Sequence, residues 1–217
     1  MNVLRLSGRI RATVLILIAM AAIAAGGWFG VRTSGAPDWP KLEAAAMYPA
    51  PRALPDFQLT ASDGRPLTAA DWKGHWTLVF FGYTSCPDVC PTTLATFKQV
   101  WNRLATAAAR IRFTFVSVDP QRDTPEQLAR YVEFFNKEFV GATGSDEELV
   151  HLTRALGLTF SREKTGDDNY TVEHSAAVLI VDPQGRQAGL FRPPFDAAKI
   201  AADLQRLVVM NSVQGGT

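Results

Sequence analysis

Cysteine and histidine are scarce in this chain of 217 residues, which contains two cysteines and three histidines. The cysteines, Cys86 and Cys90, lie four positions apart. A disulfide between them would close a loop far too small to stabilise a domain of this size. This scarcity excludes a disulfide-rich scaffold and favours a chemical role for the pair.

An excess of charge of either sign is also missing. The chain has 22 basic and 21 acidic residues and a formal net charge of +1. Charges that are so evenly balanced produce no net electrostatic field that would attract nucleic acid or an anionic surface. We therefore expect no nucleic-acid partner. The length and the apolar content predict one globular domain plus an additional segment.

Charged side chains are absent from residues 12–31, which follow a basic flank at residues 1–11. A helix of this length rises about 1.5 Å per residue and spans roughly the 30 Å hydrocarbon core of a bilayer. The basic flank should remain in the cytoplasm. We therefore expect a single-pass membrane anchor that places the remaining chain outside the cytoplasm. A cleaved signal peptide is the alternative, because Ala22-Ile23-Ala24 resembles a cleavage site.

The rest of the chain divides into a linker at residues 32–55, a domain at residues 56–210 and a tail at residues 211–217. The apolar patterns predict alternating strands and helices, followed by a hairpin and a last helix. Strands are expected at Asp56–Thr60, Trp76–Phe81, Ile111–Val118, near Phe139, and at Ser175–Val181 and Gln187–Phe191. Helices are expected at Thr92–Ala109, Thr124–Phe135, Ser145–Leu156 and Asp196–Val209. This order predicts an α/β, thioredoxin-like fold with a central mixed sheet flanked by helices.

The two cysteines follow the end of an expected buried strand, where reactive groups collect in open α/β sheets. Pro91 at the first helical position would make Cys90 the N-cap, and a helix N-terminus lowers the pKa of a thiol. Three residues separate the cysteines, whereas thioredoxin-type enzymes have two. The wider spacing suits either a redox-active disulfide between Cys86 and Cys90 or two thiolates on one soft metal ion. Spacing leaves both interpretations open.

His174 immediately precedes the expected strand Ser175–Val181. In thioredoxin-like folds this junction faces the dithiol, and redox members normally carry a cis-proline there. No proline lies between Asp168 and Val181. A neutral imidazole opposite two thiolates would form a site that holds Cu(I) and accommodates Cu(II).

At this point the chain resembles the Sco/SenC family of copper-binding assembly factors for cytochrome c oxidase. The resemblance covers about Asp56 to Val209 and depends on three motifs. They are Gly82-Tyr83-Thr84-Ser85-Cys86-Pro87-Asp88-Val89-Cys90-Pro91-Thr92, Val116-Ser117-Val118-Asp119-Pro120-Gln121-Arg122-Asp123-Thr124-Pro125 and Val172-Glu173-His174-Ser175. It implies one copper per monomer on Cys86, Cys90 and His174. It also implies a membrane-anchored chaperone whose client is oxidase subunit II or another exported copper protein.

Three carboxylates are candidates for supporting the site from outside the ligand set: Asp119, Asp88 and Glu173. For Asp119 an ordinary turn role is favoured over support of the site, and for the other two a solvated loop position is the commoner outcome. His75 and His151 are expected to be ordinary surface or satisfied histidines. We expect a metallochaperone rather than an enzyme. A thiol–disulfide reductase for exported proteins is the main alternative, and a peroxidase is the third.

Overall fold

The computed structural model describes residues 15–22, 37–165 and 170–214, with side chains described as far as residue 211. The chain divides into two compact units, Met1–Asp38 and Trp39–Thr217. In the first unit, residues 15–22 are helical. No helix within the described part of the chain is both long and apolar enough to cross a membrane. The expected basic flank at residues 1–11 and most of the expected anchor at residues 12–31 lie outside the described residues.

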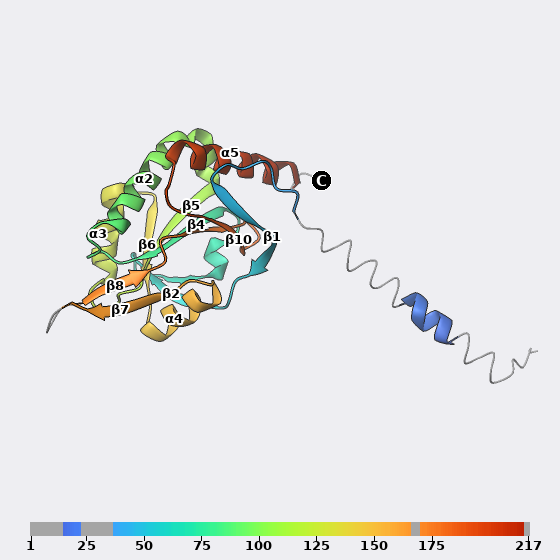
Figure 1. Cartoon of the computed structure of the whole chain (residues 1–217), viewed down its shortest axis with the longest axis horizontal. Coiled ribbons are helices and arrows are strands. Elements are labelled where there is room, and N and C mark those ends of the chain that lie inside the picture. The colour runs from blue at the N-terminus through green and yellow to red at the C-terminus, as the bar shows by residue number, and fades with distance from the viewer. Residues whose placement is uncertain (1–14, 23–36, 166–169, 215–217) are drawn as a thin grey trace, which may run out of the picture. The chain divides into compact units, whose positions relative to one another are not determined.

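An eight-stranded mixed sheet forms the centre of the second unit, with the order β1-β10-β9-β4-β5-β6-β2-β3 (Figure 1). Its strands are β1 (Ala45–Ala53), β2 (Gln58–Ala61), β3 (Pro66–Thr68), β4 (Trp76–Gly82), β5 (Ile111–Ser117), β6 (Phe139–Thr143), β9 (Val178–Val181) and β10 (Arg186–Phe191). The neighbours β4, β5 and β6 are parallel, and the other pairs are antiparallel. A separate ribbon consists of β7 (Phe160–Lys164) and β8 (Tyr170–His174).

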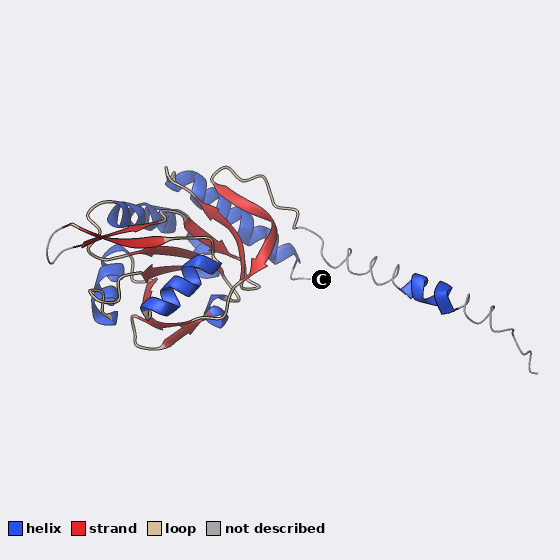
Figure 2. Ribbon diagram, turned by 60° about the horizontal axis from the view of Figure 1, so that its bottom comes forward, coloured by secondary structure: helices blue, strands red, loops and turns tan. Residues whose placement is uncertain are grey.

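The centre of the sheet is apolar because both of its faces are covered. Every residue of β4 is buried, as expected for a parallel strand with helices on both sides. Figure 2 shows helices on both sides of the sheet. The helices are α2 (Val89–Arg103), α3 (Pro125–Phe135), α4 (Asp146–Ala155) and α5 (Ala197–Gln214), with short 3₁₀ turns η1 (Ala69–Trp72) and η2 (Ala105–Arg110). Helix α2 packs against both α5 and α3.

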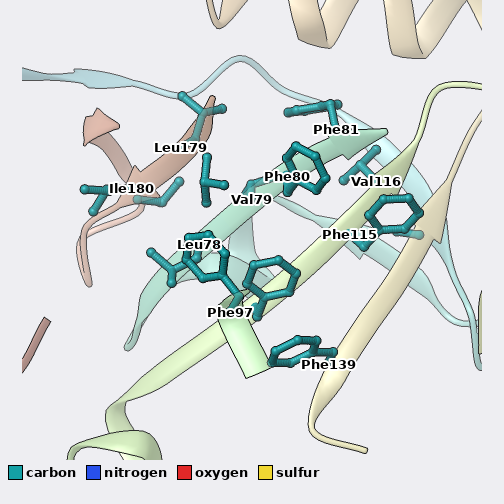
Figure 3. Packing of buried hydrophobic residues seen from close by; sticks show 14 of the residues in the cluster. Leu78, Val79, Phe80, Phe81, Phe97, Phe115, Val116, Phe139, Leu179 and Ile180 are labelled. Atoms are coloured by element: carbon teal, nitrogen blue, oxygen red, sulfur yellow. The ribbon is translucent and has the colours of Figure 1, made fainter. Parts of the chain in front are cut away.

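The core lies between the sheet and these helices (Figure 3). The ring of Phe97, from α2, lies 5.2 Å from that of Phe113, and Phe113 lies 4.4 Å from Phe139. Aromatic contacts of this kind therefore join α2 to two neighbouring strands. This packing holds α2 against the sheet, and the first turn of α2 carries Cys90.

Local signals predicted several helix ends correctly. Thr124 Oγ1 accepts a hydrogen bond from the Gln127 backbone N–H, and Gln127 Oε1 accepts one from the Thr124 backbone N–H, which forms a capping box at the start of α3. Asp196 accepts hydrogen bonds from the backbone of Ala198 and Lys199 at the start of α5. These ends were predictable because the capping residues interact with atoms only a few positions away.

The expected linker at residues 32–55 requires a correction, because it contains β1. This strand pairs with β10 and forms one edge of the sheet. Pro49 and Pro51 lie within β1, and their presence argued against a strand, because proline in sheets is confined to edges and bulges. Here β1 is an edge strand, and its register shifts between Met47 and Arg52. The folded domain therefore begins before the predicted boundary at residue 56.

Further boundaries differ from the sequence-based expectation. Helix α5 continues to Gln214 and so includes part of the expected tail at residues 211–217. The helix expected at Thr92–Ala109 ends at Arg103 and continues as the 3₁₀ turn η2. The strand expected at Ser175–Val181 begins only at Val178, and His174 instead ends β8. The hairpin of β7 and β8 was not predicted. Most of its residues are polar and at least partly exposed, so the hairpin carries little apolar periodicity.

Candidate metal centre

The two cysteines lie where β4 passes into α2, at the carboxyl edge of the parallel strands. Cys86 is in the connecting loop and is half-buried, whereas Cys90 is in the first turn of α2 and is fully buried. Both are free thiols. The expectation that Cys90 is the N-cap was wrong, because the helix begins at Val89 and Asp88 occupies that position.

His174 reaches the cysteines from the end of β8. Its Nδ1 lies 3.3 Å from the carbonyl oxygen of Ser175. Because a carbonyl oxygen only accepts, this contact assigns the proton of the neutral ring to Nδ1. The Nε2 lone pair is then available on the opposite side, 3.3 Å from Cys90 Sγ. The rings of Phe80 and Tyr83 meet the imidazole edge-on and hold its plane.

Within the described residues, Cys86, Cys90 and His174 form a group able to hold a metal ion, with ligand atoms all within 4.8 Å of one another. The Cys90 backbone N–H also donates to Cys86 Sγ at 3.4 Å. Two thiols and a neutral imidazole fit a soft or borderline ion such as copper. The fold thus brings together residues that are 84 positions apart in the sequence.

Burial controls the acid–base properties of these groups. It raises the pKa of the Cys90 thiol well above its ordinary value, and the nearby Cys86 and Asp123 act in the same direction. The expected lowering by the helix N-terminus is therefore wrong for the metal-free protein, because desolvation of a thiolate outweighs it. Burial also lowers the pKa of His174, which keeps the imidazole neutral. A cation that binds here must displace the Cys90 proton.

Gly82, the last residue of β4, allows Cys90 to lie against the strand. A Cβ atom at Gly82 would lie 2.6 Å from Cys90 Sγ and 2.9 Å from the ring of Phe115. Neither contact is tolerable for a carbon atom, so this position requires a residue without a side chain. The sequence analysis included Gly82 in a motif without identifying this reason.

The three candidate supporting carboxylates occupy different places. Asp88 is exposed and accepts a hydrogen bond from Thr92 Oγ1. Glu173 is also exposed, although its charge acts on the pKa of the neighbouring His174 in the raising direction.

Asp119, in contrast, is fully buried and anchors the hairpin that carries His174. Its carboxylate accepts hydrogen bonds from Tyr170 Oη at 2.6 Å and from Arg122 Nε. The Arg122 guanidinium lies 3.8 Å from the centre of the Tyr170 ring and donates to the Tyr170 carbonyl. Arg162 of β7 lies 4.0 Å from the same carboxylate. Asp119 therefore binds Tyr170, the first residue of β8, whereas His174 is the last residue of the same strand.

The sequence analysis did not single out Asp123, which binds the loop that leads to Cys86. Its carboxylate is 1% exposed and accepts hydrogen bonds from Thr84 and Ser117. Its position within the quoted Val116–Pro125 motif was the available signal. The other histidines lie elsewhere: His75 precedes β4 and contacts the Lys73 carbonyl, and His151 is exposed on α4.

The SCO1/SenC family model matches residues 45–209, from the first residue of β1 into α5. The chain belongs to the SCO1/SenC family. This result confirms the resemblance inferred from the motifs, and the mixed sheet with flanking helices is the α/β thioredoxin-like fold of Sco proteins.

Individual Sco proteins give the same result. The bovine mitochondrial SCO2 homologue is 30% identical over 200 residues, which cover 91% of this chain and 75% of the bovine protein. The structure of Bradyrhizobium japonicum ScoI with copper bound is 35% identical, with a TM-score of 0.67 over 71% of this chain and 99% of that one. The apo Sco1 structure from Thermus thermophilus is 32% identical, with a TM-score of 0.64 over 78% of this chain and 95% of that one.

Proposed function

We propose that this Sco protein binds one copper ion through Cys86, Cys90 and His174 and delivers it to an exported copper protein. The client proposed from the family is subunit II of cytochrome c oxidase. The observation that carries the proposal is the convergence of two thiols and one imidazole within 4.8 Å. The copper-bound ScoI structure of Bradyrhizobium japonicum supports the choice of metal.

The arrangement of the three residues favours transfer as well as binding. Cys90 is fully buried, whereas Cys86 and His174 are partly exposed. Incoming copper is held as cargo by the two sulfur atoms after their protons leave, and the imidazole Nε2 completes the set. A ligand of the client can approach from the exposed side and replace Cys86 or His174 while Cys90 still holds the ion.

The proposed location is the periplasmic side of a bacterial inner membrane, with residues 12–31 as the anchor. The apolar run and its basic flank support this part of the proposal. Fractionation of cells, followed by protease treatment of spheroplasts, tests it. An anchored domain should sediment with membranes and be digested from outside. A protein that remains protected inside spheroplasts would refute the location.

Copper stoichiometry in the full chain, purified in detergent and reduced, tests the binding site. The wild-type chain should hold one copper, and the Cys86→Ser/Cys90→Ser double variant should hold none. His174→Ala should weaken binding and remove or shift the thiolate-to-Cu(II) absorption. His151→Ala is the matched control and should bind as wild type does. Unchanged stoichiometry in the double cysteine variant would disprove the proposal.

A second function, reduction of disulfides in exported proteins, is supported by the two free thiols within 4.8 Å of each other. In this reaction Cys86 and Cys90 lose two electrons and two protons and form a disulfide, and the client disulfide becomes two thiols. A thiol donor must then reduce the pair again. Equilibration with glutathione tests this function, since a pair too oxidising to reduce client disulfides is incompatible with it.

A further inference from the structure

Asp123 forms the tightest polar contacts of the loop between β4 and Cys86. Its Oδ2 accepts a hydrogen bond from the Thr84 backbone N–H at 2.8 Å, and its Oδ1 accepts one from Thr84 Oγ1 at 2.6 Å. Ser117 Oγ, at the end of β5, donates to Oδ2 at 2.5 Å. One buried carboxylate therefore joins the ends of two neighbouring parallel strands, β4 and β5. Its partner on the β4 side, Thr84, lies two residues before Cys86.

The two cysteines differ in how they are held. Cys90 belongs to α2, whose core side chains fix its position, and it lies against Gly82. Cys86 lies in a loop. Its N–H makes a long hydrogen bond to the Tyr83 carbonyl at 3.3 Å, and its Sγ accepts one from the Cys90 N–H at 3.4 Å. The position of Cys86 therefore depends on how firmly Thr84 is held.

We propose that Asp123 is a positioning residue for the dithiol, and that its hydrogen bonds to Thr84 hold Cys86 Sγ at the distance from Cys90 needed to share a ligand or form a disulfide. Insofar as that ligand is copper, the inference depends on the proposed function. The expected effect on the distance between the two sulfur atoms is independent of the proposed function. Asp123 makes no described hydrogen bond to either cysteine, although its charge contributes to the raised pKa of Cys90. The positioning effect proposed here acts through Thr84.

Two simpler roles for Asp123 predict different results. If the carboxylate only stabilises the fold, its loss should resemble the loss of any buried carboxylate with similar partners. If its charge matters, Asp123→Asn should be as harmful as Asp123→Ala. The positioning role predicts that asparagine is adequate. Its side-chain oxygen can take the place of Oδ2 and accept from Thr84 N–H and Ser117, while its NH₂ donates to Thr84 Oγ1.

The experiment measures Cu(I) affinity by chelator competition and the Cys86–Cys90 disulfide equilibrium against glutathione, in the full chain in detergent. Asp123→Ala should weaken copper binding about 10–100-fold, the usual effect of losing a residue that supports metal ligands. It should lower the disulfide equilibrium constant about tenfold, which raises the reduction potential by about 30 mV. Asp123→Asn should stay within about threefold of wild type in both measurements. Thr84→Val, which removes one of the bonds, should be intermediate and is the decisive variant if Asp123→Ala does not fold.

Asp182→Ala is the matched control. Asp182 is also 1% exposed and accepts hydrogen bonds from Gln184, Arg186 N and Arg186 Nε. It follows Val181, which pairs with Thr77 near the start of β4, far from the cysteines at the other end. This variant should lower the unfolding temperature without altering either site measurement.

Equal effects of Asp123→Ala and Asp182→Ala, or an Asp123→Asn variant as impaired as Asp123→Ala, would overturn the inference. A wild-type chain that binds no copper would refute the proposed function, and the disulfide equilibrium would still decide the role of Asp123.

Discussion

Burial gives Cys86 and Cys90 different chemistry although they belong to one short motif. Cys90 is fully buried and its pKa is raised, whereas Cys86 is partly exposed in a loop. The positive end of α2 is too weak to reverse this, since helix-end effects are worth about 0.3–1 kcal/mol. A bound metal ion would stabilise the Cys90 thiolate, because its positive charge compensates for the desolvation of the sulfur.

Acid should destabilise the metal-free protein through His174. Burial lowers the pKa of this ring in the folded state below the ordinary value of 6.5. Below about pH 6.5 the unfolded chain binds the proton first, so stability present at higher pH is lost as the pH falls. Thermal unfolding from pH 7.5 to 5.5 should show a smaller loss for His174→Gln than for wild type. His151→Gln, on the exposed side of α4, should retain the wild-type dependence, and an unaltered slope in His174→Gln would contradict the prediction.

Gly82→Ala should impair both stability and metal binding. The added carbon would lie 2.6 Å from Cys90 Sγ, and overpacking of this kind costs about 1–3 kcal/mol. Urea unfolding and copper titration measure the two effects. Gly144→Ala is the control, because its Cβ would lie 2.8 Å from Leu59 Cδ2, away from the cysteines. It should destabilise the fold but leave copper affinity unchanged. Normal copper affinity in Gly82→Ala would show that Cys90 can move freely.

At the scale of elements, the hairpin of β7 and β8 carries the third candidate ligand, His174, without being part of the main sheet. Phe160 pairs with His174 at one end, and Lys164 pairs with Tyr170 at the other. Tyr83 Oη also hydrogen-bonds Thr171 Oγ1 at 3.0 Å, so the loop that leads from β4 to the cysteines supports the hairpin directly. Side-chain contacts therefore determine where His174 lies.

Tyr170→Phe should loosen this hairpin. The variant loses the 2.6 Å hydrogen bond to Asp119, and a hydrogen bond to a charged group contributes about 1.5–3 kcal/mol. Amide hydrogen exchange in β7 and β8 should become faster, and copper affinity should fall. The control Tyr48→Phe loses a neutral hydrogen bond with Gln187 and should leave exchange in the hairpin unaffected. Unaltered protection of β8 in Tyr170→Phe would mean that the remaining contacts, including those of Arg122 and Tyr83, hold it without the Tyr170 hydroxyl.

At the scale of the whole domain, Asp203 joins the two ends of the chain's folded region. This fully buried carboxylate of α5 accepts hydrogen bonds from the backbone N–H groups of Glu43, Ala44 and Ala45, at the start of β1. Arg206 balances its charge at 3.1 Å. The contacts attach β1 to a helix about 160 residues later.

Asp203→Ala should destabilise the domain by about 2–4 kcal/mol, because it leaves several buried donors without a partner. Denaturant unfolding measures the change, and limited proteolysis should cut near residues 43–45 first. Asp196→Ala, which removes the exposed cap of α5, should cost about 0.5–2 kcal/mol. Equal stability losses in the two variants would contradict this account of how β1 is attached.

Local sequence patterns were enough to predict much of this protein. The apolar run of β4 and the helix starts at Thr124 and Asp196 depend on neighbouring residues, so their signals are local. The same holds for the cysteine pair at the end of β4. Together with the motifs around His174, these features identified the family and the three candidate ligands.

The tertiary structure decided the features that depend on distant partners. Pairing with β10 made a proline-containing segment into β1, and burial against Gly82 and Phe115 reversed the expected pKa shift of Cys90. Asp119 was already a candidate from the sequence, but its contact with Tyr170, and the contact of Asp123 with Thr84, could be seen only in the tertiary structure. The physical reason is the same in each case: desolvation and hydrogen bonding depend on which atoms surround a group, and those atoms come from other parts of the chain.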